Sequence, residues 1–378
     1  MRNTEWIRGI LIGVCCLALC RGVTCQAEET DPDLDGKPLS TWVKQLRSDN
    51  RGLQLRAART LAAAPVDLHA RIVPLVIPVL KSERENDKFV AAQVLGECGP
   101  AARATVPHLL PMLAGTQYER NRAAAAKSLG QILKDAQSSE EVDKVVDALA
   151  AKFNEDYDKY SDVRREAVRA LGMIGPAAKK CIPKLTRALT DFVLYSKEHQ
   201  MVRQQAAWTC GRMGPLAAEH MDRLLAMMHA EGGEIPEIVE AIGCIGPIRD
   251  NIVPNIMDKM ERKDGGTAWQ KESWQALQKF GAKAEAVLPF AKRFITNPQF
   301  YGTNNSRERE ALVIEVLKLL RVAGPKAIDA LPQVENLAHY KYPYNEEDDM
   351  TPVMRKEAAI TVGILKAIAP AGGEAKRD

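Results

Sequence analysis

The aromatic side chains best suited to recognition gather in a few uneven stretches of the chain. All eight tyrosines lie within residues 115–121, 153–162, 191–201, 297–307 and 339–352. A tyrosine offers a large contact area and a hydroxyl at low entropic cost, so it is enriched at recognition surfaces. We therefore expect a protein-binding edge that includes Tyr157, Tyr160, Tyr195, Tyr301, Tyr340, Tyr342 and Tyr344. The alternative is that these rings cover helix ends beneath the loops.

The sequence lacks the short motifs that mark catalytic and metal sites. It contains no G-x-S-x-G, H-E-x-x-H, P-loop or G-x-G-x-x-G pattern, and its histidines show no metal-ligand spacing. Residues 31–36 copy the first half of a calcium loop, but Trp42 stands where a bidentate Glu is required. From the absence of these motifs we predict a non-catalytic protein with no cofactor and no metal. Because the calcium loop is incomplete, we predict that residues 28–38 form a flexible acidic segment.

Residues 1–27 have the form of a secretory signal peptide. A basic start precedes an apolar run, and small residues occupy the cleavage positions Cys25 and Ala27. The apolar run, of about 11 residues, is much shorter than the roughly 20 residues that span a bilayer. We expect cleavage near Ala27 and a location in the bacterial periplasm or outside the cell, with no transmembrane span. The alternative is a lipoprotein anchored at Cys20, because residues 17–20 resemble a lipobox.

Composition points to a helical protein and argues against a nucleic-acid partner. Aromatic residues make up 5% of the chain and hydrophobic residues 46%, as in stacked helices built from Ala, Leu, Val and Ile. The 52 basic residues nearly balance the 49 acidic ones, so no global field attracts nucleic acid. Outside the leader, four cysteines lie within apolar helical patterns, and we expect buried thiols there rather than disulfides or a zinc site: Cys98, Cys181, Cys210 and Cys244.

One short pattern recurs along the chain and predicts how the helices connect. Gly-Pro, or a close variant, is followed seven residues later by a second Pro, as in Pro100/Pro107, Pro176/Pro183, Pro247/Pro254 and Pro325/Pro332, and after Gly281-Ala282 by Pro289. A Gly after a helix adopts the left-handed conformation that ends it, and Pro suits the first position of the next helix. Each Gly-Pro therefore predicts a tight turn between two helices. The second Pro should bend or restart the second helix.

The helices that precede these turns share three columns of equivalent positions. Two columns are apolar and predict the core: Leu95, Leu129, Leu171, Cys210, Ile242, Leu277 and Leu320, and then Cys98, Ile132, Ile174, Met213, Ile245, Phe280 and Ala323. The third column is polar in every copy but one and predicts a solvent-facing wall: Gln93, Lys127, Arg169, Trp208, Glu240, Gln275 and Lys318. We expect Arg169 and Trp208 to contact a partner on the concave side. The alternative for Trp208 is partial burial against the neighbouring repeat.

This repeat resembles the HEAT repeat, especially the bacterial HEAT-like repeats also found in phycobilin lyases. The resemblance rests on the Val-Arg start, the Ala-Leu-Gly-x-Ile-Gly-Pro-Ala-Ala end and the following Ile-Pro-x-Leu, with departures near Leu133 and Asp222. It implies an all-α, right-handed α-solenoid of eight or nine helix pairs over residues 39–369, without sheet and with polar end units, followed by a disordered tail over 370–378.

The functional expectation from the resemblance is an exported protein-interaction scaffold that acts as a monomer. The alternative is an enzyme that uses the groove of the solenoid, similar to HEAT-like DNA glycosylases or lyases. Both of those activities would call for access to the cell interior, and the glycosylase also for a basic groove.

Overall fold

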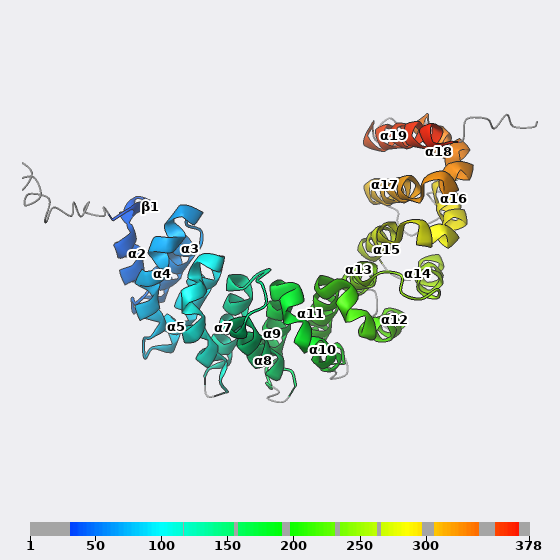
Figure 1. Ribbon diagram of the computed structural model, residues 1–378. Coiled ribbons are helices and arrows are strands. Elements are labelled where there is room, and N and C mark those ends of the chain that lie inside the picture. The colour runs from blue at the N-terminus through cyan, green and yellow to red at the C-terminus, as the bar shows by residue number, and fades with distance from the viewer. Residues whose placement is uncertain are drawn as a thin grey trace, which may run out of the picture.

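The protein is an all-α solenoid that curves into an arch (Figure 1). The structure is a computed structural model that describes residues 31–115, 117–154, 158–190, 197–230, 235–262, 266–296, 306–339 and 352–369. The all-α solenoid predicted from the sequence is confirmed. The predicted leader and C-terminal tail lie outside the described residues.

The helices form two parallel rows. After a short first helix, α2 (Leu39–Gln45), each helix of the inner row contacts the next one in that row, and this row lines the concave side of the arch (Figure 1). The inner row consists of α3 (Arg51–Ala62), α5 (Glu85–Glu97), α7 (Glu119–Ile132), α9 (Ser161–Ile174), α11 (Lys197–Met213), α13 (Pro236–Ile245), α15 (Thr267–Phe280), α17 (Ser306–Ala323) and α19 (Pro352–Ile368). The outer row consists of α4 (Val66–Leu80), α6 (Val106–Leu109), α8 (Glu140–Ala151), α10 (Ile182–Leu189), α12 (Met221–His229), α14 (Ile252–Glu261), α16 (Leu288–Thr296) and α18 (Leu331–Ala338).

The Gly-Pro turns follow the predicted chemistry with one difference. The glycine that follows α5, α9, α11, α13, α15 and α17 has a positive φ, for example 74° at Gly175 and 61° at Gly324. In most of these turns the Gly-Pro pair lies at the start of a short 3₁₀ segment instead of an α-helix, such as Gly175–Cys181, whereas no 3₁₀ segment follows Gly246-Pro247. The second Pro then lies in the first turn of the outer α-helix, as Pro183 does in α10. The second Pro therefore restarts the helix. Pro has no N–H group, and the N–H groups in the first turn of a helix have no partner within the helix, so no hydrogen bond is lost there.

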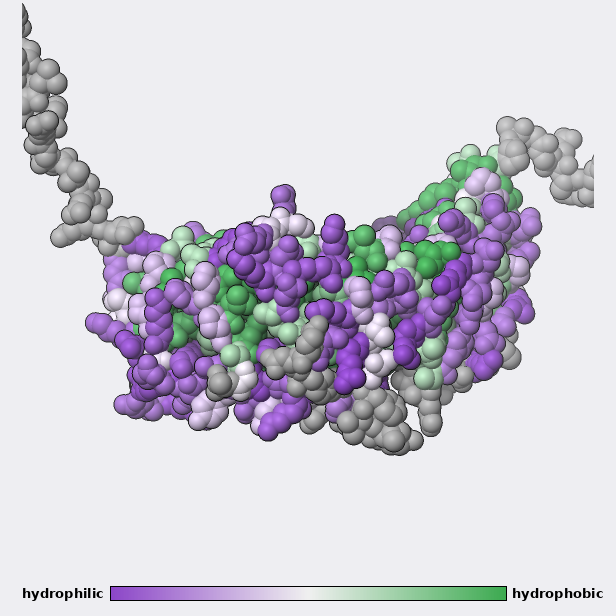
Figure 2. Space-filling view, turned by 60° about the horizontal axis from the view of Figure 1, so that its bottom comes forward, coloured by the Kyte–Doolittle hydropathy of each residue, from purple (hydrophilic) through white to green (hydrophobic). Residues whose placement is uncertain are grey.

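The two apolar columns form the core between the rows. Every member of the Leu171 column is fully buried, and the members of the Ile174 column range from fully buried at Ile174 to 8% exposed at Ala323. No member of the third column is buried, as a solvent-facing wall requires. The face seen in Figure 2 is mainly hydrophilic, and its largest hydrophobic area lies toward the C-terminal end, at the upper right.

Two predictions about the N-terminal segment were wrong. Residues 33–38 form a small antiparallel hairpin, β1 (Asp33–Leu34) and β2 (Lys37–Pro38), so the chain has a sheet and residues 31–38 have a defined fold. Asp35 and Gly36 both take positive φ values, the conformation that an Asp-Gly hairpin turn needs. The indole N–H of Trp42 donates to the Leu34 carbonyl at 2.6 Å, which fixes the hairpin on α2.

Both departures from the repeat pattern have local replacements. Asp135 takes the left-handed conformation (φ 51°) near the turn that lacks Gly-Pro, and its N–H donates to the Met173 carbonyl at 2.9 Å. Asp is one of the few residues besides Gly that tolerate this conformation. In α12, which lacks the second Pro, Asp222 lies in the first turn, where a carboxylate interacts favourably with the helix dipole.

Glycines bring neighbouring inner helices unusually close, in a column that we call the glycine seam: Gly96, Gly130, Gly172, Gly211 and Gly243. A Cβ added to Gly130 would lie 2.6 Å from Cα of Ala170 on α9, and one added to Gly243 would lie 2.7 Å from Cα of Ala276 on α15. Side chains are therefore excluded at Gly130 and Gly243 by the backbone of the next helix.

Over the described residues, no helix is both long and apolar enough to cross a membrane.

Candidate functional site

Two adjoining cavities form a groove along the N-terminal ends of α3, α5, α7 and α9. Their volumes are about 580 and 450 Å³, and both are lined by Glu119 and Arg120. The first is lined by Ser48, Asp49, Arg51, Gln54, Arg84, Glu85, Asn86, Asp87 and Tyr118, and the second by Phe89, Gln93, Ala123, Ala124, Lys127, Lys159, Tyr160, Ser161, Asp162, Arg165 and Glu166. We call the two together the N-terminal groove.

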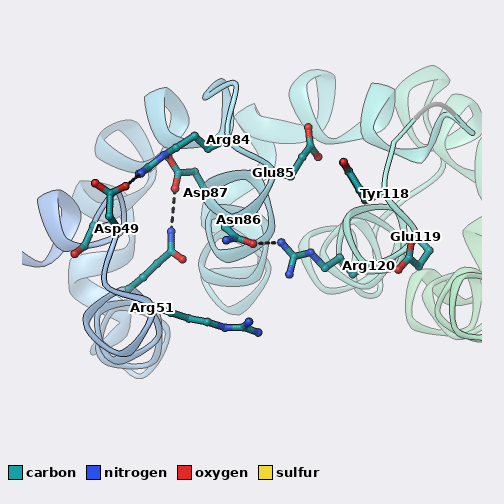
Figure 3. A pocket seen from close by; sticks show the side chains of 11 residues that line it. Asp49, Arg51, Arg84, Glu85, Asn86, Asp87, Tyr118, Glu119 and Arg120 are labelled. Atoms are coloured by element: carbon teal, nitrogen blue, oxygen red, sulfur yellow. Dashed lines mark hydrogen bonds and ion pairs between the residues drawn. The ribbon is translucent and has the colours of Figure 1, made fainter.

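A buried carboxylate organises the floor of the first cavity (Figure 3). Asp87 is fully buried and accepts hydrogen bonds from Gln54 at 2.9 Å, from Ser82 at 2.9 Å and from the Arg84 Nε at 3.0 Å. Arg84 also pairs with Asp49, and the hydrogen bond to Asp87, followed by the charges of both carboxylates, raises the pKa of this guanidinium. These partners satisfy Asp87, so it serves as a structural anchor that joins α3 to α5.

Arg120 lies where the two cavities meet. Its guanidinium donates to the side-chain oxygen of Asn86 (Figure 3). It also lies over the Phe89 ring, 5.2 Å from the ring centroid. The Tyr118 ring lies nearby in the first cavity and is 61% exposed. A flat cation, an aromatic ring and a phenol therefore face solvent together, which is the composition typical of binding hot spots.

A buried ion pair holds Tyr160 at the rim of the second cavity. Arg122 donates to both oxygens of Asp158, at 2.6 and 2.9 Å, and neither side chain is more than 7% exposed. Asp158 accepts from the Tyr160 N–H at 3.0 Å, and its carbonyl accepts from Arg164 at 2.7 Å. Burial works to raise the pKa of Asp158, but the hydrogen bonds from Arg122 and the Tyr160 N–H outweigh it and lower that pKa. The Tyr160 ring thus has a fixed base while remaining 40% exposed.

The second cavity also contains a carboxylate with one oxygen free among the described residues. Glu166 is only 9% exposed, and its Oε1 accepts from Arg165 at 3.2 Å. Its Oε2 is buried and has no hydrogen-bond partner in the part of the chain that the structure describes. An unsatisfied buried oxygen of this kind costs free energy that a donor from a ligand can recover.

The groove carries as many basic as acidic side chains. The basic side chains that line it are Arg51, Arg84, Arg120, Lys127, Lys159 and Arg165, and the acidic ones are Asp49, Glu85, Asp87, Glu119, Asp162 and Glu166. Within the described residues, no cluster of His, Cys, Asp and Glu has the arrangement of a metal site. Mixed charge with exposed aromatic rings suits a polypeptide, which presents both signs of charge and apolar side chains.

The structure separates the predicted site residues. Tyr160 lines the groove, whereas Tyr157, Tyr195, Tyr301, Tyr340, Tyr342 and Tyr344 lie outside the described residues. Arg169 is exposed on α9 but does not line either cavity. The Trp208 ring is partly buried over α9, since a Cβ added to Gly172 would lie 2.4 Å from its Cζ3. Partner binding by these residues stays a prediction.

Most groove residues were missed at the level of the sequence. The solvent-facing column through Arg169 includes two lining residues, Gln93 and Lys127. The column four positions earlier in the same alignment contains Phe89 and Arg165, and reading it would have shown the second cavity. The first cavity is set by contacts between residues more than 30 positions apart, such as Gln54 with Asp87, for which a single sequence holds no signal.

The cysteines behave as small hydrophobic residues. All four within the described residues are free, and all but Cys244 are buried. Burial raises the pKa of Cys98 to about 11 and that of Cys181 and Cys210 to about 12. At neutral pH these thiols stay protonated and are poor nucleophiles.

Comparison with known proteins identifies the repeat. Residues 39–130 and 106–192 match a family model of HEAT repeats. The structure of importin beta superposes with a TM-score of 0.60 at 14% identity, over 86% of this chain and 47% of importin beta. Kap121p bound to Ste12p gives 0.63 at 13% identity (88% and 39% covered), and yeast importin-beta, Kap95p, gives 0.59 at 11% (87% and 45%).

These comparisons define the fold and the repeat type. The chain spans less than half the length of the importins it resembles, and at such low identity the likeness concerns the fold alone. A search of curated proteins gives no match. The repeat match and the two-row solenoid together show that this chain is a HEAT-repeat protein.

Proposed function

We propose that the protein is a non-catalytic scaffold that binds a segment of another protein in the N-terminal groove. The observation that carries this proposal is the groove itself, where exposed Tyr118 and Tyr160 stand beside Arg120 and the free oxygen of Glu166. Rigid aromatic rings and a bidentate cation at one site are the usual sources of binding energy in protein interfaces. Kap121p, which has a similar fold, was crystallised with Ste12p bound.

The groove favours an extended segment with at least one basic side chain. Its length follows four helix ends, and its walls supply donors at Arg51 and Arg120 and an acceptor at Glu166. A lysine or arginine of the partner would pair with the Glu166 carboxylate once this side chain turns its buried Oε2 toward the groove, and an apolar side chain would cover Phe89 and Tyr160. We propose that the other tyrosines of the predicted protein-binding edge contribute to binding of the same partner.

We further propose that the protein acts outside the cytoplasm of a bacterium, after removal of residues 1–27. The support is the signal-like leader in the sequence. Mass measurement of the mature protein tests the proposal, because cleavage near Ala27 leaves a chain that begins at Glu28. A mass that includes a diacylglycerol on Cys20 would favour the lipoprotein alternative instead.

Affinity capture with matched variants tests the binding proposal. Wild-type protein, a Tyr160→Ala/Arg120→Ala variant and a Leu216→Ala control are used as bait in envelope extracts, and captured proteins are identified by mass spectrometry. Leu216 is 49% exposed on the 3₁₀ segment Gly214–His220, which does not line the groove. We expect a partner that the wild type and the control retain and the groove variant loses. Equal retention by all three baits would contradict binding in the groove.

A further inference from the structure

The outward face of α19 repeats a packing surface that every glycine of the seam uses. Residues 354–365 align with residues 163–174 of α9, so that Glu357-Ala358 matches Glu166-Ala167 and Gly363 matches Gly172. Gly363 therefore occupies the seam position, after two inner helices that carry Gln278 and Arg321 there. In the five earlier seam glycines, an added Cβ would lie 2.4 to 3.1 Å from the next helix. At Gly363 an added Cβ would meet nothing within 4 Å.

The side chains around Gly363 form an exposed apolar stripe. Val353, Ile360 and Ile364 are spaced at intervals of seven and four and are 56%, 41% and 37% exposed. At the Ile360 position, three of the other inner helices carry Lys127, Arg169 and Lys318, so an isoleucine on solvent is a departure. The two lysines expected to give this end unit a polar outer face, Lys356 and Lys366, are both exposed. Lys356, however, lies within an otherwise apolar face that also includes Ala359 and Ala367.

A glycine inside a helix lowers its stability relative to alanine, so the seam glycines need a reason. For the earlier members the reason is the close approach of the next helix: its backbone lies against Gly130, Gly211 and Gly243, and its side chains lie nearest to Gly96 and Gly172. For Gly363 the described residues supply no such neighbour. The arrangement of small and large residues on this face suits a helix from outside that approaches as closely as the inner helices approach one another.

From these observations we infer that the α19 face binds the α19 face of a second copy of this chain, forming a two-fold symmetric dimer. In an antiparallel pair, Ile360 of each copy lies opposite Gly363 of the other, and Ile364 lies opposite Ala359. Large residues then fill the positions of small ones on both sides, which is the self-complementarity that a two-fold interface requires. The dimer extends the seam contact already present between successive inner helices.

The other end of the described solenoid does not offer an equivalent surface. There α2 packs against α3 and α4, and Leu39, Trp42 and Leu46 are at most 1% exposed. Lys37 and Arg56 lie over the Trp42 ring, 4.8 and 5.7 Å from its centroid. A polar, covered end cannot receive the apolar face of α19, so the contact is between two C-terminal ends rather than head to tail. The sequence alone suggested a monomer.

Sedimentation velocity of the full chain tests this inference. The protein concentration should run from about 1 to 200 μM, because one helix face buries less area than a standard interface and should give a weak dimer. Ile360→Lys, which restores the residue type of the column, should weaken dimerisation at least tenfold. Ile248→Lys is the matched control, because Ile248 is 44% exposed and lies after the Gly246-Pro247 turn. Gly363→Gln, which places the α15 residue at this position, should also weaken it while circular dichroism shows an intact fold.

Hydrogen exchange at both ends of the concentration range locates the contact. We expect amides of α19 to be protected more strongly at high concentration, and this change to be absent in Ile360→Lys. A monomer at every concentration would overturn the inference, as would a dimer that Ile360→Lys leaves intact. A ladder of larger species would indicate head-to-tail association and would also overturn it. Strong protection of α19 at every concentration would show that another segment of the same chain covers the face, with the same consequence.

Discussion

Replacing Gly130 by alanine tests the close approach of the inner helices. Alanine is favoured over glycine within a helix by about 1 kcal/mol, so an unobstructed substitution stabilises the protein. At Gly130, however, the new Cβ would lie 2.6 Å from Cα and 2.7 Å from Cβ of Ala170. Carbon atoms in contact prefer a separation of about 3.5 to 4.0 Å, so α7 and α9 would have to move apart by about 1 Å.

The obstruction outweighs the helix propensity. Overpacking of a tight contact costs about 1 to 3 kcal/mol, and here the obstructing atoms are backbone that cannot rotate away. Subtracting the gain in propensity of about 1 kcal/mol leaves an expected loss of up to about 2 kcal/mol in the free energy of unfolding. Gly211→Ala should cost less, because its nearest atom is 3.1 Å away, and Gly363→Ala should stabilise by about 0.5 to 1 kcal/mol.

Urea unfolding followed by circular dichroism, at a protein concentration of about 1 μM, measures the series. The low concentration keeps α19 free of the proposed dimer contact. The expected order of midpoints is Gly363→Ala, then wild type, then Gly211→Ala, then Gly130→Ala. If Gly130→Ala stabilised the protein as much as Gly363→Ala does, the backbone contact between α7 and α9 would not exist as described.

Three further predictions concern ionisable side chains. Asp158→Asn should lower the free energy of unfolding by about 3 kcal/mol at pH 7, because it leaves Arg122 buried without a counter-charge. Since folding lowers the pKa of Asp158, the stability advantage of the wild type should be present above about pH 4 and shrink as the pH falls further. Urea midpoints measured from pH 3 to 7 would show this change. Glu272→Gln should raise the urea midpoint at pH 7, because burial and the nearby charge of Glu240 raise the pKa of Glu272, so that its ionisation above about pH 4 costs stability. An unchanged midpoint at pH 7, or an equal increase at pH 3, would contradict this. Site-resolved alkylation of the native protein at pH 8 should modify Cys244 before Cys98, Cys181 and Cys210, and fast reaction of Cys210 would show that its burial is wrong.

The sequence predicted the fold well because the fold depends on residues near one another in the chain. Gly175 ends α9 and Leu171 faces the core for reasons that one repeat contains. The groove could not be predicted to the same degree, because its shape depends on pairs such as Arg122 with Asp158, which come from different repeats. The hairpin at residues 33–38 was missed because its Asp-Gly turn was read only as part of an acidic segment.

The glycine seam also has a mechanical consequence for the solenoid. Where Gly130 meets Ala170 and Gly243 meets Ala276, backbone touches backbone, so α7 cannot move closer to α9, nor α13 to α15. The outer helices α6, α8, α10, α12 and α14 have no such seam, and their separation is set by softer side-chain contacts. Bending of the arch should therefore turn about the inner row as a fixed edge. The mouth of the N-terminal groove would then keep its width while the spacing between the outer helices increases and decreases.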